Sequence, residues 1–266
     1  MGFSNDTPRQ IPAVFIGHGN PMNAVEINPF TARWRELAAA LPRPAAILSV
    51  SAHWYTPGTR VTPEEHPRTI HDFGGFPRRL YEVQYPAPGS PQLAGRVRDL
   101  LDPAAPVALD AGWGLDHGTW SVLAHLFPQA DVPVIQLGLD ETLAAADHFE
   151  LARRLQPLRD EGVLILGSGN VVHNLHAYGW GERSASTYDW AVRFEAWARE
   201  RIAARDFESV VAYERLGVDA ALAVPTPDHF LPLLYVLAVS DREEPIAFPM
   251  EGFDGRSVSM LCVRAG

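Results

Sequence analysis

The stretch AAILSVSAHW, residues 45–54, decides the fold that we predict for this chain of 266 residues. It is a continuous apolar run of strand length, and it ends on His53. Continuous apolar runs of this kind are typical of strands that are buried on both faces of a parallel sheet. In open α/β sheets, ligands bind in the crevice outside the carboxyl ends of the strands. His53 is therefore placed where chemistry is expected.

Two more apolar segments end in the same way. Residues 12–19, PAVFIGHG, lead into His18, and residues 162–173, GVLILGSGNVVH, lead through a glycine-rich turn into His173. One such histidine would mean little, but three favour a shared site, and neutral imidazole is a common ligand of zinc and also suits ferrous iron. We predict a shared metal at His18, His53 and His173. The alternative is a set of separate caps and hydrogen-bonded core histidines.

Strand and helix patterns alternate along the rest of the chain. They predict further strands at residues 13–16, 106–109, 132–137 and 163–166, and helices at residues 30–41, 90–101, 119–127, 141–159, 188–204 and 229–239. This order favours one α/β domain over residues 1–266, with a mainly parallel, mixed central sheet, helices on both faces and the metal site at the carboxyl ends of strands. Residues 245–263 read as two strands that turn at Asp254-Gly255.

Residues 55–88 break this pattern with segments that are rich in proline, glycine and aromatic residues. So long a stretch without periodicity is unusual inside a compact domain and is commonly functional or disordered. Its aromatic content favours an ordered, functional loop.

The composition excludes several classes of function. The formal net charge is −10 and no basic run is present, which argues against a nucleic-acid partner. The chain has no lysine, so Schiff-base catalysis and a phosphate-loop lysine are excluded. The single cysteine, Cys262, is expected to be a buried small hydrophobe. Residues 1–10 lack the pattern of a signal peptide and no apolar segment is long enough to span a bilayer, so we expect a soluble, cytoplasmic protein.

Two further histidines each follow an aspartate, His117 in LDHGTW and His229 in TPDHFLPLL. Each could be a ligand or a carrier of protons, because histidine titrates near neutrality. We favour function for His117, which we place in a loop bracketed by glycine, whereas for His229 a role in capping the following helix is equally plausible. We expect structural or surface roles for His66, His125, His148 and His176.

Two other motifs give weak signals. The segment GSGNVV at residues 167–172 follows a strand but lacks the third glycine of a dinucleotide-binding fingerprint. Ser168 does not lie in a G-x-S-x-G elbow, so a serine hydrolase has little support.

Six motifs in order carry a family resemblance over nearly the whole chain. They are GHGNPMNA (17–24), SAHW (51–54), HDFGGFPRRLYEVQYPAPG (71–89), LDHGTWSVL (115–123), GSGNVVHNL (167–175) and TPDHFLPLLYVLA (226–238). Together they resemble the class III extradiol ring-cleavage dioxygenases, and specifically their 4,5-DOPA dioxygenase branch. The resemblance implies a non-haem metal enzyme that opens a small catechol-type substrate with molecular oxygen, on an α/β fold with the metal at the strand ends.

The resemblance also implies roles for individual residues. His18, His53 and His173 match metal ligands, His229 matches a fourth ligand or a catalytic group close to the metal, and His117 matches the catalytic acid or base. Ferrous iron, Fe(II), is expected for activity. Enzymes of this type generally use two histidines and a carboxylate, and an all-histidine set should also hold zinc, Zn(II).

The residues leave two other functions open. The same histidines could activate water in a zinc-dependent hydrolase of an amide or ester, or the chain could be a silent member that binds a metal or an aromatic molecule. For a dioxygenase, the loop at residues 71–89 would cover the substrate. The aromatic residues that could line its site are Trp54, Phe73, Phe76, Tyr81, Trp113 and Trp120.

Overall fold

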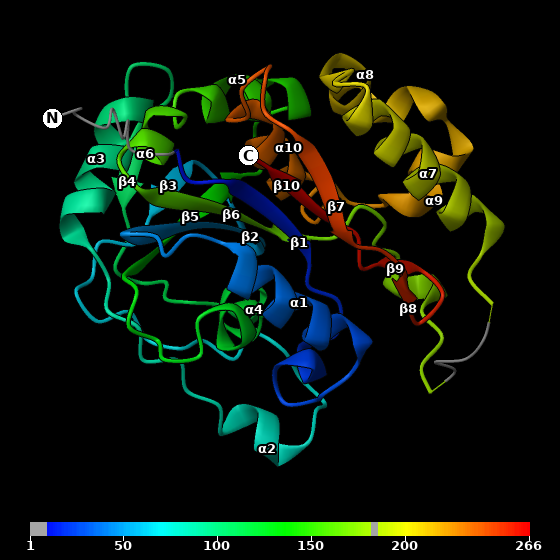
Figure 1. Cartoon of the computed structure of the whole chain (residues 1–266), viewed down its shortest axis with the longest axis horizontal. Coiled ribbons are helices and arrows are strands. Elements are labelled where there is room, and N and C mark those ends of the chain that lie inside the picture. Colours follow the sequence, from blue (N-terminus) through cyan, green and yellow to red (C-terminus); the bar gives the residue numbers. More distant parts are fainter. Residues whose placement is uncertain (1–9, 182–185) are drawn as a thin grey trace, which may run out of the picture.

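A computed structural model describes residues 10–181 and 186–266. These residues form one eight-stranded sheet with helices packed against both of its faces (Figure 1). In sheet order its strands are β4 (Val107–Leu109), β3 (Thr59–Val61), β5 (Val134–Asp140), β2 (Ala46–Thr56), β6 (Val163–Gly169), β1 (Ala13–Gly17), β10 (Cys262–Ala265) and β7 (Ile246–Met250). A separate hairpin pairs β8 (Phe253–Asp254) with β9 (Val258–Ser259).

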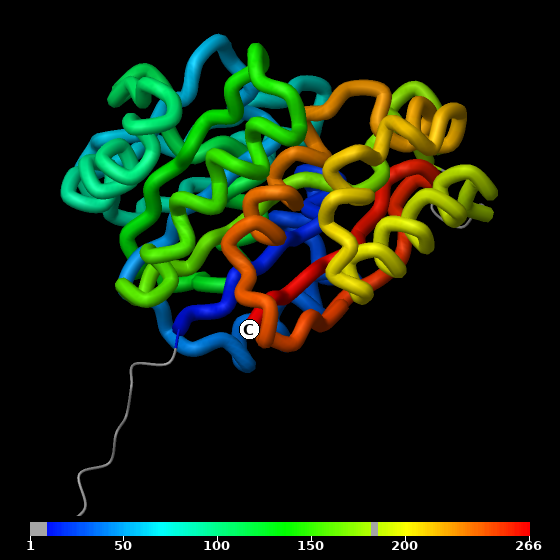
Figure 2. Tube along the Cα trace, turned by 90° about the horizontal axis from the view of Figure 1, so that it is seen from above, coloured from blue at the N-terminus to red at the C-terminus, as the bar shows by residue number. Residues whose placement is uncertain are grey.

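The predicted mixed, mainly parallel sheet is confirmed. Strands β5, β2, β6 and β1 run parallel to one another, and β3 pairs parallel with β4 but antiparallel with β5. The C-terminal strand β10 pairs antiparallel with both β1 and β7. Figure 2 shows this red strand beside the blue first strand. The carboxyl ends of the neighbouring strands β1, β6 and β2 therefore lie side by side, where His18 follows β1, His173 follows β6, and His53 lies in the last part of β2.

Alternate residues of each central strand face two hydrophobic cores. One core joins sheet residues such as Phe15 and Leu48 to α3 (Pro91–Leu101), α5 (Ala145–Arg153), α7 (Asp189–Ala203) and α10 (Leu231–Ala238). The other joins Ile16 and Ile47 to α1 (Pro29–Ala40) and α4 (His117–Leu126). In Figure 1 the labels of α1 and α4 lie below the sheet and those of α5 and α10 lie above it. The remaining helical segments are η1 (Pro21–Ala24), α2 (Arg78–Tyr81), α6 (Pro157–Asp160), η2 (Leu175–Ala177), α8 (Phe207–Val211), η3 (Tyr213–Leu216) and α9 (Val218–Ala223).

Strand β2 is longer than its apolar run predicts. It reaches Thr56, so His53 lies within the strand and not beyond it. The register against β5 changes on the way, because the five-residue step from Val50 to Tyr55 faces only the step from Leu137 to Leu139. Extra residues of this kind bend a strand and redirect its side chains, and such bulges occur often beside active sites.

Other differences arise where short elements have no periodic signal. The stretch at residues 55–88 contains β3 and α2, which we expected to be irregular. The helix expected at residues 141–159 is two helices, because Pro157 cannot continue α5 and instead begins α6. Strand β1 and helices α1, α3 and α7 match their predicted ranges to within two residues. The turn near Asp254-Gly255 joins β8 to β9, while the longer strands of this region are β7 and β10.

No helix among the described residues is both long and apolar enough to cross a bilayer. Cys262 is fully buried in β10, and burial raises the pKa of its thiol to about 12, as expected of a structural cysteine. Residues 1–9, on which the expectation of no signal peptide rests, lie outside the described part of the chain.

Candidate metal centre

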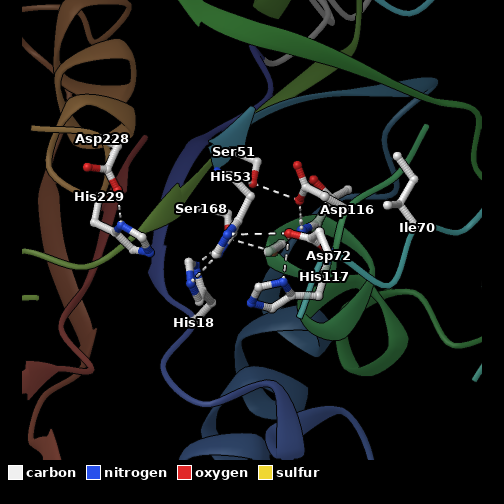
Figure 3. Close-up of polar contacts among 12 residues, drawn as sticks. His18, Ser51, His53, Ile70, Asp72, Asp116, His117, Ser168, Asp228 and His229 are labelled. Atoms are coloured by element: carbon white, nitrogen blue, oxygen red, sulfur yellow. Dashed lines mark hydrogen bonds and ion pairs between the residues drawn. The ribbon is translucent and has the colours of Figure 1, made fainter. Parts of the chain in front are cut away.

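The register of the central strands brings the first two histidines together. Gly17 of β1 pairs with Gly169 of β6, and Ser168 of β6 pairs with Ser51 of β2. His18 follows β1 directly, and its backbone N–H donates to the carbonyl of Gly169 at 3.1 Å. His53 stands two residues beyond Ser51 in the irregular part of β2. The Nε2 atoms of His18 and His53 are consequently only 3.1 Å apart (Figure 3).

A serine fixes the proton on the His18 ring. The hydroxyl of Ser168 donates to the carbonyl of Gly118 at 2.6 Å, and its oxygen lies 3.1 Å from Nδ1 of His18. Because the serine proton is used on Gly118, Ser168 can only accept from His18, which therefore carries its proton on Nδ1. The Nε2 lone pair of His18 is then free and points at His53.

A carboxylate from a distant loop contacts the next two histidines. Nδ1 of His117 donates to Oδ2 of Asp72 at 2.9 Å, and the backbone N–H of His117 donates to Oδ1 at 2.8 Å. Nδ1 of His53 lies 3.4 Å from the same Oδ2. Because a carboxylate only accepts hydrogen bonds, His117 carries its proton on Nδ1 and presents an unprotonated Nε2 on its other side. The negative charge of Asp72 beside Nδ1 of His53 favours the same proton position on that ring.

His229 is oriented by its own neighbour. Its Nδ1 donates to Oδ2 of Asp228, which leaves Nε2 buried without a hydrogen-bond partner among the described residues. The carbonyl of His229 accepts from the backbone N–H of Asn170 at 2.8 Å, which ties His229 to the end of β6. The ring of His173 is stacked on that of His229, with the ring centres 3.4 Å apart.

The five histidines that we singled out thus form one cluster. Ring centres of His229 lie 5.4 Å from His18 and 5.1 Å from His53, and that of His117 lies 3.8 Å from His53. Within the described ranges, the group whose ligand atoms all lie within 4.8 Å of one another is His18, His53 and His117. His173 joins the cluster through His229 and is not a member of that group.

The electrostatics keep three of these imidazoles neutral, those of His18, His53 and His173. Burial, followed by the charges that the neighbouring histidines would carry, lowers the pKa of His18 and of His53 well below 6.5. Burial, followed by His229, lowers the pKa of His173 to about 2. Neutral imidazole is the form that binds metals.

A metal ion fits this arrangement better than an empty cluster does. Two unprotonated nitrogens repel each other at 3.1 Å, and the unpartnered Nε2 of His229 lacks any compensation for its burial. Two nitrogens that bind the same ion, each at ~2.1 Å, lie roughly 3 to 3.4 Å apart. The Nε2 atoms of His18 and His53 have this separation.

Two carboxylates that we did not predict from the sequence, Asp72 and Asp228, lie behind the histidine rings. Burial would raise the pKa of Asp72, but hydrogen bonds from His117 outweigh it and the pKa is lowered. For Asp228, likewise, burial is outweighed by the hydrogen bond from His229, and its pKa falls to about 2. The expected all-histidine centre therefore has two carboxylates directly behind its rings. Asp228 could have been suspected from its place beside His229, whereas Asp72 lies 45 residues from His117.

The location of His117 differs from our expectation. It is the first residue of α4 and does not lie in a loop. The helix begins there because the side chain of Asp116 accepts from the backbone N–H of Thr119 and caps it. Asp116 also accepts from Ser51 at 2.7 Å, which joins the start of α4 to β2.

Of the aromatic residues expected to line the site, some contact the histidine cluster and others pack elsewhere. The ring of Phe73 contacts His117 edge to face at 5.4 Å, and it also contacts Phe76 and Tyr81. Trp120 is fully buried, and Trp54 is stacked on Trp113.

The four histidines for which we expected structural or surface roles lie outside the cluster. Nε2 of His125 donates to the carbonyl of Asn23, His148 lies between Tyr235 and the carbonyl of Asp140, and His66 and His176 are exposed.

Comparisons with known proteins agree with this geometry. The model of the catalytic LigB subunit of aromatic ring-opening dioxygenase matches residues 12–256. The chain is 49% identical over 262 residues to a protein named 4,5-DOPA dioxygenase extradiol from Escherichia coli (strain K12), with 97% of this chain and 95% of that protein covered. It is 38% identical over 251 residues to the Beta vulgaris protein of the same name, with 92% of each covered.

A solved structure extends the likeness to three dimensions. The crystal structure of an uncharacterized protein from Escherichia coli K12 superposes with a TM-score of 0.85 at 45% identity, and covers 97% of this chain and 100% of that one. With the family model spanning most of the sequence and a histidine cluster at the strand ends, the chain belongs to the LigB family of extradiol, aromatic ring-opening dioxygenases.

Proposed function

We propose that this enzyme opens a catechol that carries a short polar side chain, as DOPA does, and that its working metal is ferrous iron. The observation that carries the proposal is the pair of facing Nε2 atoms of His18 and His53, with Nδ1 of His18 hydrogen-bonded to Ser168 and Nδ1 of His53 3.4 Å from the carboxylate of Asp72. The names of the relatives from Escherichia coli and Beta vulgaris support a DOPA-like substrate.

We assign the metal to His18, His53, His173 and His229. In Figure 3, His18 and His53 lie between His229 on one side and His117 with Asp72 on the other. The unpartnered Nε2 of His229 would be available to hold an ion on this side of the cluster. His117 is then left across the cluster, beside the ring of Phe73.

A bound ferrous ion supplies a Lewis acid for the catechol hydroxyls and a route for electrons from the ring to oxygen, which zinc cannot supply because it has no redox chemistry. The residues of the chain handle the protons. Nε2 of His117 is free to take a proton from the substrate and to return it, while Nδ1 is held by Asp72. An imidazole that is held by a carboxylate at one nitrogen and exchanges protons at the other is a recurrent acid-base arrangement.

The experiment that tests the activity compares two metals in one protein. Protein stripped of metal and refilled anaerobically with ferrous iron should, with a catechol of this class and air, consume oxygen in step with loss of the ring. Protein refilled with zinc should do neither. Oxygen uptake that is absent with iron over a panel of such catechols would contradict the proposal.

Single variants test the assignment of roles. His18→Ala, His53→Ala and His173→Ala should each lose most of the bound metal while remaining folded. His117→Ala should keep the metal and lose turnover by a factor of ~10² or more. The close group of His18, His53 and His117 offers the opposite assignment, which loss of metal in His117→Ala but not in His173→Ala would establish.

We also propose that residues 1–266 act as a single catalytic domain in the cytoplasm. The two cores on the faces of one sheet support a single domain. Limited proteolysis that releases a stable folded fragment would contradict it.

A further inference from the structure

We propose that Asp72 is a positioning residue that sets the proton positions of His53 and His117 together, and thereby couples the aromatic loop to the metal centre. The inference rests on the proposed function for the role of the metal. Its physical basis is that one carboxylate contacts two rings that belong to different elements, β2 and α4.

The contacts of Asp72 leave little freedom to these rings. Oδ2 accepts from Nδ1 of His117 at 2.9 Å and lies 3.4 Å from Nδ1 of His53, and Oδ1 accepts from the backbone N–H of His117 at 2.8 Å. The side chain of Asp72 is only 13% exposed, so water competes weakly for it. A neutral imidazole carries its proton on Nδ1 or on Nε2, and an acceptor that is fixed at Nδ1 decides between the two. His117 therefore offers an Nε2 lone pair to the cluster, and the negative charge of Asp72 beside Nδ1 of His53 favours the same form of that ring.

The loop that supplies Asp72 pairs with the residues just before α4. Thr69 forms an isolated parallel bridge with Leu115, and the backbone N–H of Ile70 donates to the carbonyl of Leu115 at 2.7 Å. Nε1 of Trp120 donates to the carbonyl of Ile70 at 2.8 Å. These contacts place Asp72 at the first turn of α4.

The same loop brings its aromatic side chain to the same histidine. Phe73 follows Asp72 directly and packs edge to face on the ring of His117. It also contacts Phe76 and Tyr81 further along the loop. When the loop places Phe73 against His117, it therefore also places the carboxylate of Asp72 at Nδ1 of His117. The aromatic cover and the unprotonated Nε2 atoms are then present together.

Replacement by asparagine has a specific consequence. The amide has one acceptor oxygen and one donor NH₂, and the backbone N–H of His117 can only donate. The amide oxygen must therefore stay with the backbone, because the rings can move their proton and the backbone cannot. The NH₂ then faces Nδ1 of both rings and favours the form with the proton on Nε2, which removes the lone pair from the cluster.

Alanine removes the same acceptor without adding a donor. Asp72→Ala leaves both proton positions available to each ring. We expect zinc to bind Asp72→Asn about 10 to 100-fold more weakly than the unchanged protein, with Asp72→Ala between the two. A role in filling space or bridging the loop predicts the reverse order, because asparagine is the closer replacement in shape.

The test measures proton positions and metal affinity separately. Nitrogen-15 NMR of the metal-free protein, labelled at histidine, should show Nδ1–H for His53 and His117, and Nε2–H for both of these rings in Asp72→Asn. The matched control is Asp228→Asn, which should change only His229. Zinc affinity is then measured by competition with a chelator.

Each result decides one question. Unchanged proton positions in Asp72→Asn, or zinc binding that is weaker in Asp72→Ala than in Asp72→Asn, would overturn the role of Asp72. If the unchanged protein binds neither zinc nor iron, the proposed function fails, and the NMR comparison still decides whether Asp72 sets the two rings.

Discussion

The enclosed carboxyl group of Glu195 in α7 should make the free energy of unfolding depend on pH. Its carboxylate accepts from the hydroxyl of Ser259 in β9 and is largely enclosed between α7 and the C-terminal hairpin. Burial, with a smaller contribution from Glu251, raises its pKa from 4.5 to about 7, against the opposing hydrogen bond from Ser259. The folded protein therefore binds this proton more tightly than the unfolded chain does.

The sign of the pH dependence follows from this difference. Below pH 4.5 the carboxyl group is protonated in both states and costs no stability. Between pH 4.5 and pH 7 only the unfolded chain ionises, so the free energy of unfolding falls as the pH rises. Above pH 7 the full cost is present, at most about 3 kcal/mol for a shift of this size. Because the side chain retains some contact with water, we expect about 1 to 3 kcal/mol.

The perturbation is Glu195→Gln, which keeps the volume and an acceptor for Ser259 but cannot ionise. Urea unfolding followed by tryptophan fluorescence should show this variant more stable than the unchanged protein at pH 8, by the amount above, with the gain shrinking to nothing at pH 4.5. The matched control is Glu200→Gln on the same helix, whose side chain is 69% exposed and should change stability little at any pH. A gain for Glu195→Gln that is constant between pH 4.5 and 8 would refute the reasoning.

Two further predictions concern packing. In Gly169→Ala the new Cβ would lie 2.2 Å from the carbonyl oxygen of His229, so the backbone must move, at a cost of about 1 to 3 kcal/mol, and zinc affinity should fall. The control Gly95→Ala, whose Cβ meets nothing within 4 Å, should leave zinc affinity unchanged. Equal zinc titrations for the two variants would contradict this prediction. Arg159 is fully buried and donates to the carbonyls of Ile11, Val239 and Ala265 as well as to the carboxylate of Glu244. In urea unfolding, Arg159→Met should therefore lower the free energy of unfolding by about 3 to 5 kcal/mol, and adding Glu244→Gln should recover part of that loss. A loss under about 1 kcal/mol would show that the buried pair adds little.

Some of the site could be read from the sequence because it depends on local patterns. The apolar runs of β1 and β6 identify buried strands, and His18 and His173 follow them at short distance, so their approach to one edge of the sheet follows from parallel pairing. The start of α3 is equally local, since Ser90 caps it by accepting from the backbone N–H of Leu93. The six ordered motifs carried the family resemblance for the same reason, as each is a short contiguous pattern.

What the tertiary structure alone decided depends on pairs of residues far apart in the chain. The change of register in β2 that places His53 exists only against β5. The contacts of Asp116 with Ser51 and Gln136 hold the first turn of α4, and His117 with it, against the sheet. The contact of Asp72 with His53 and His117 has no periodic signal at all. Hydrophobic periodicity reports which face of a segment is buried, but the partner of a buried imidazole is set by which loop the packed sheet brings to it, and that is fixed only when the whole chain folds.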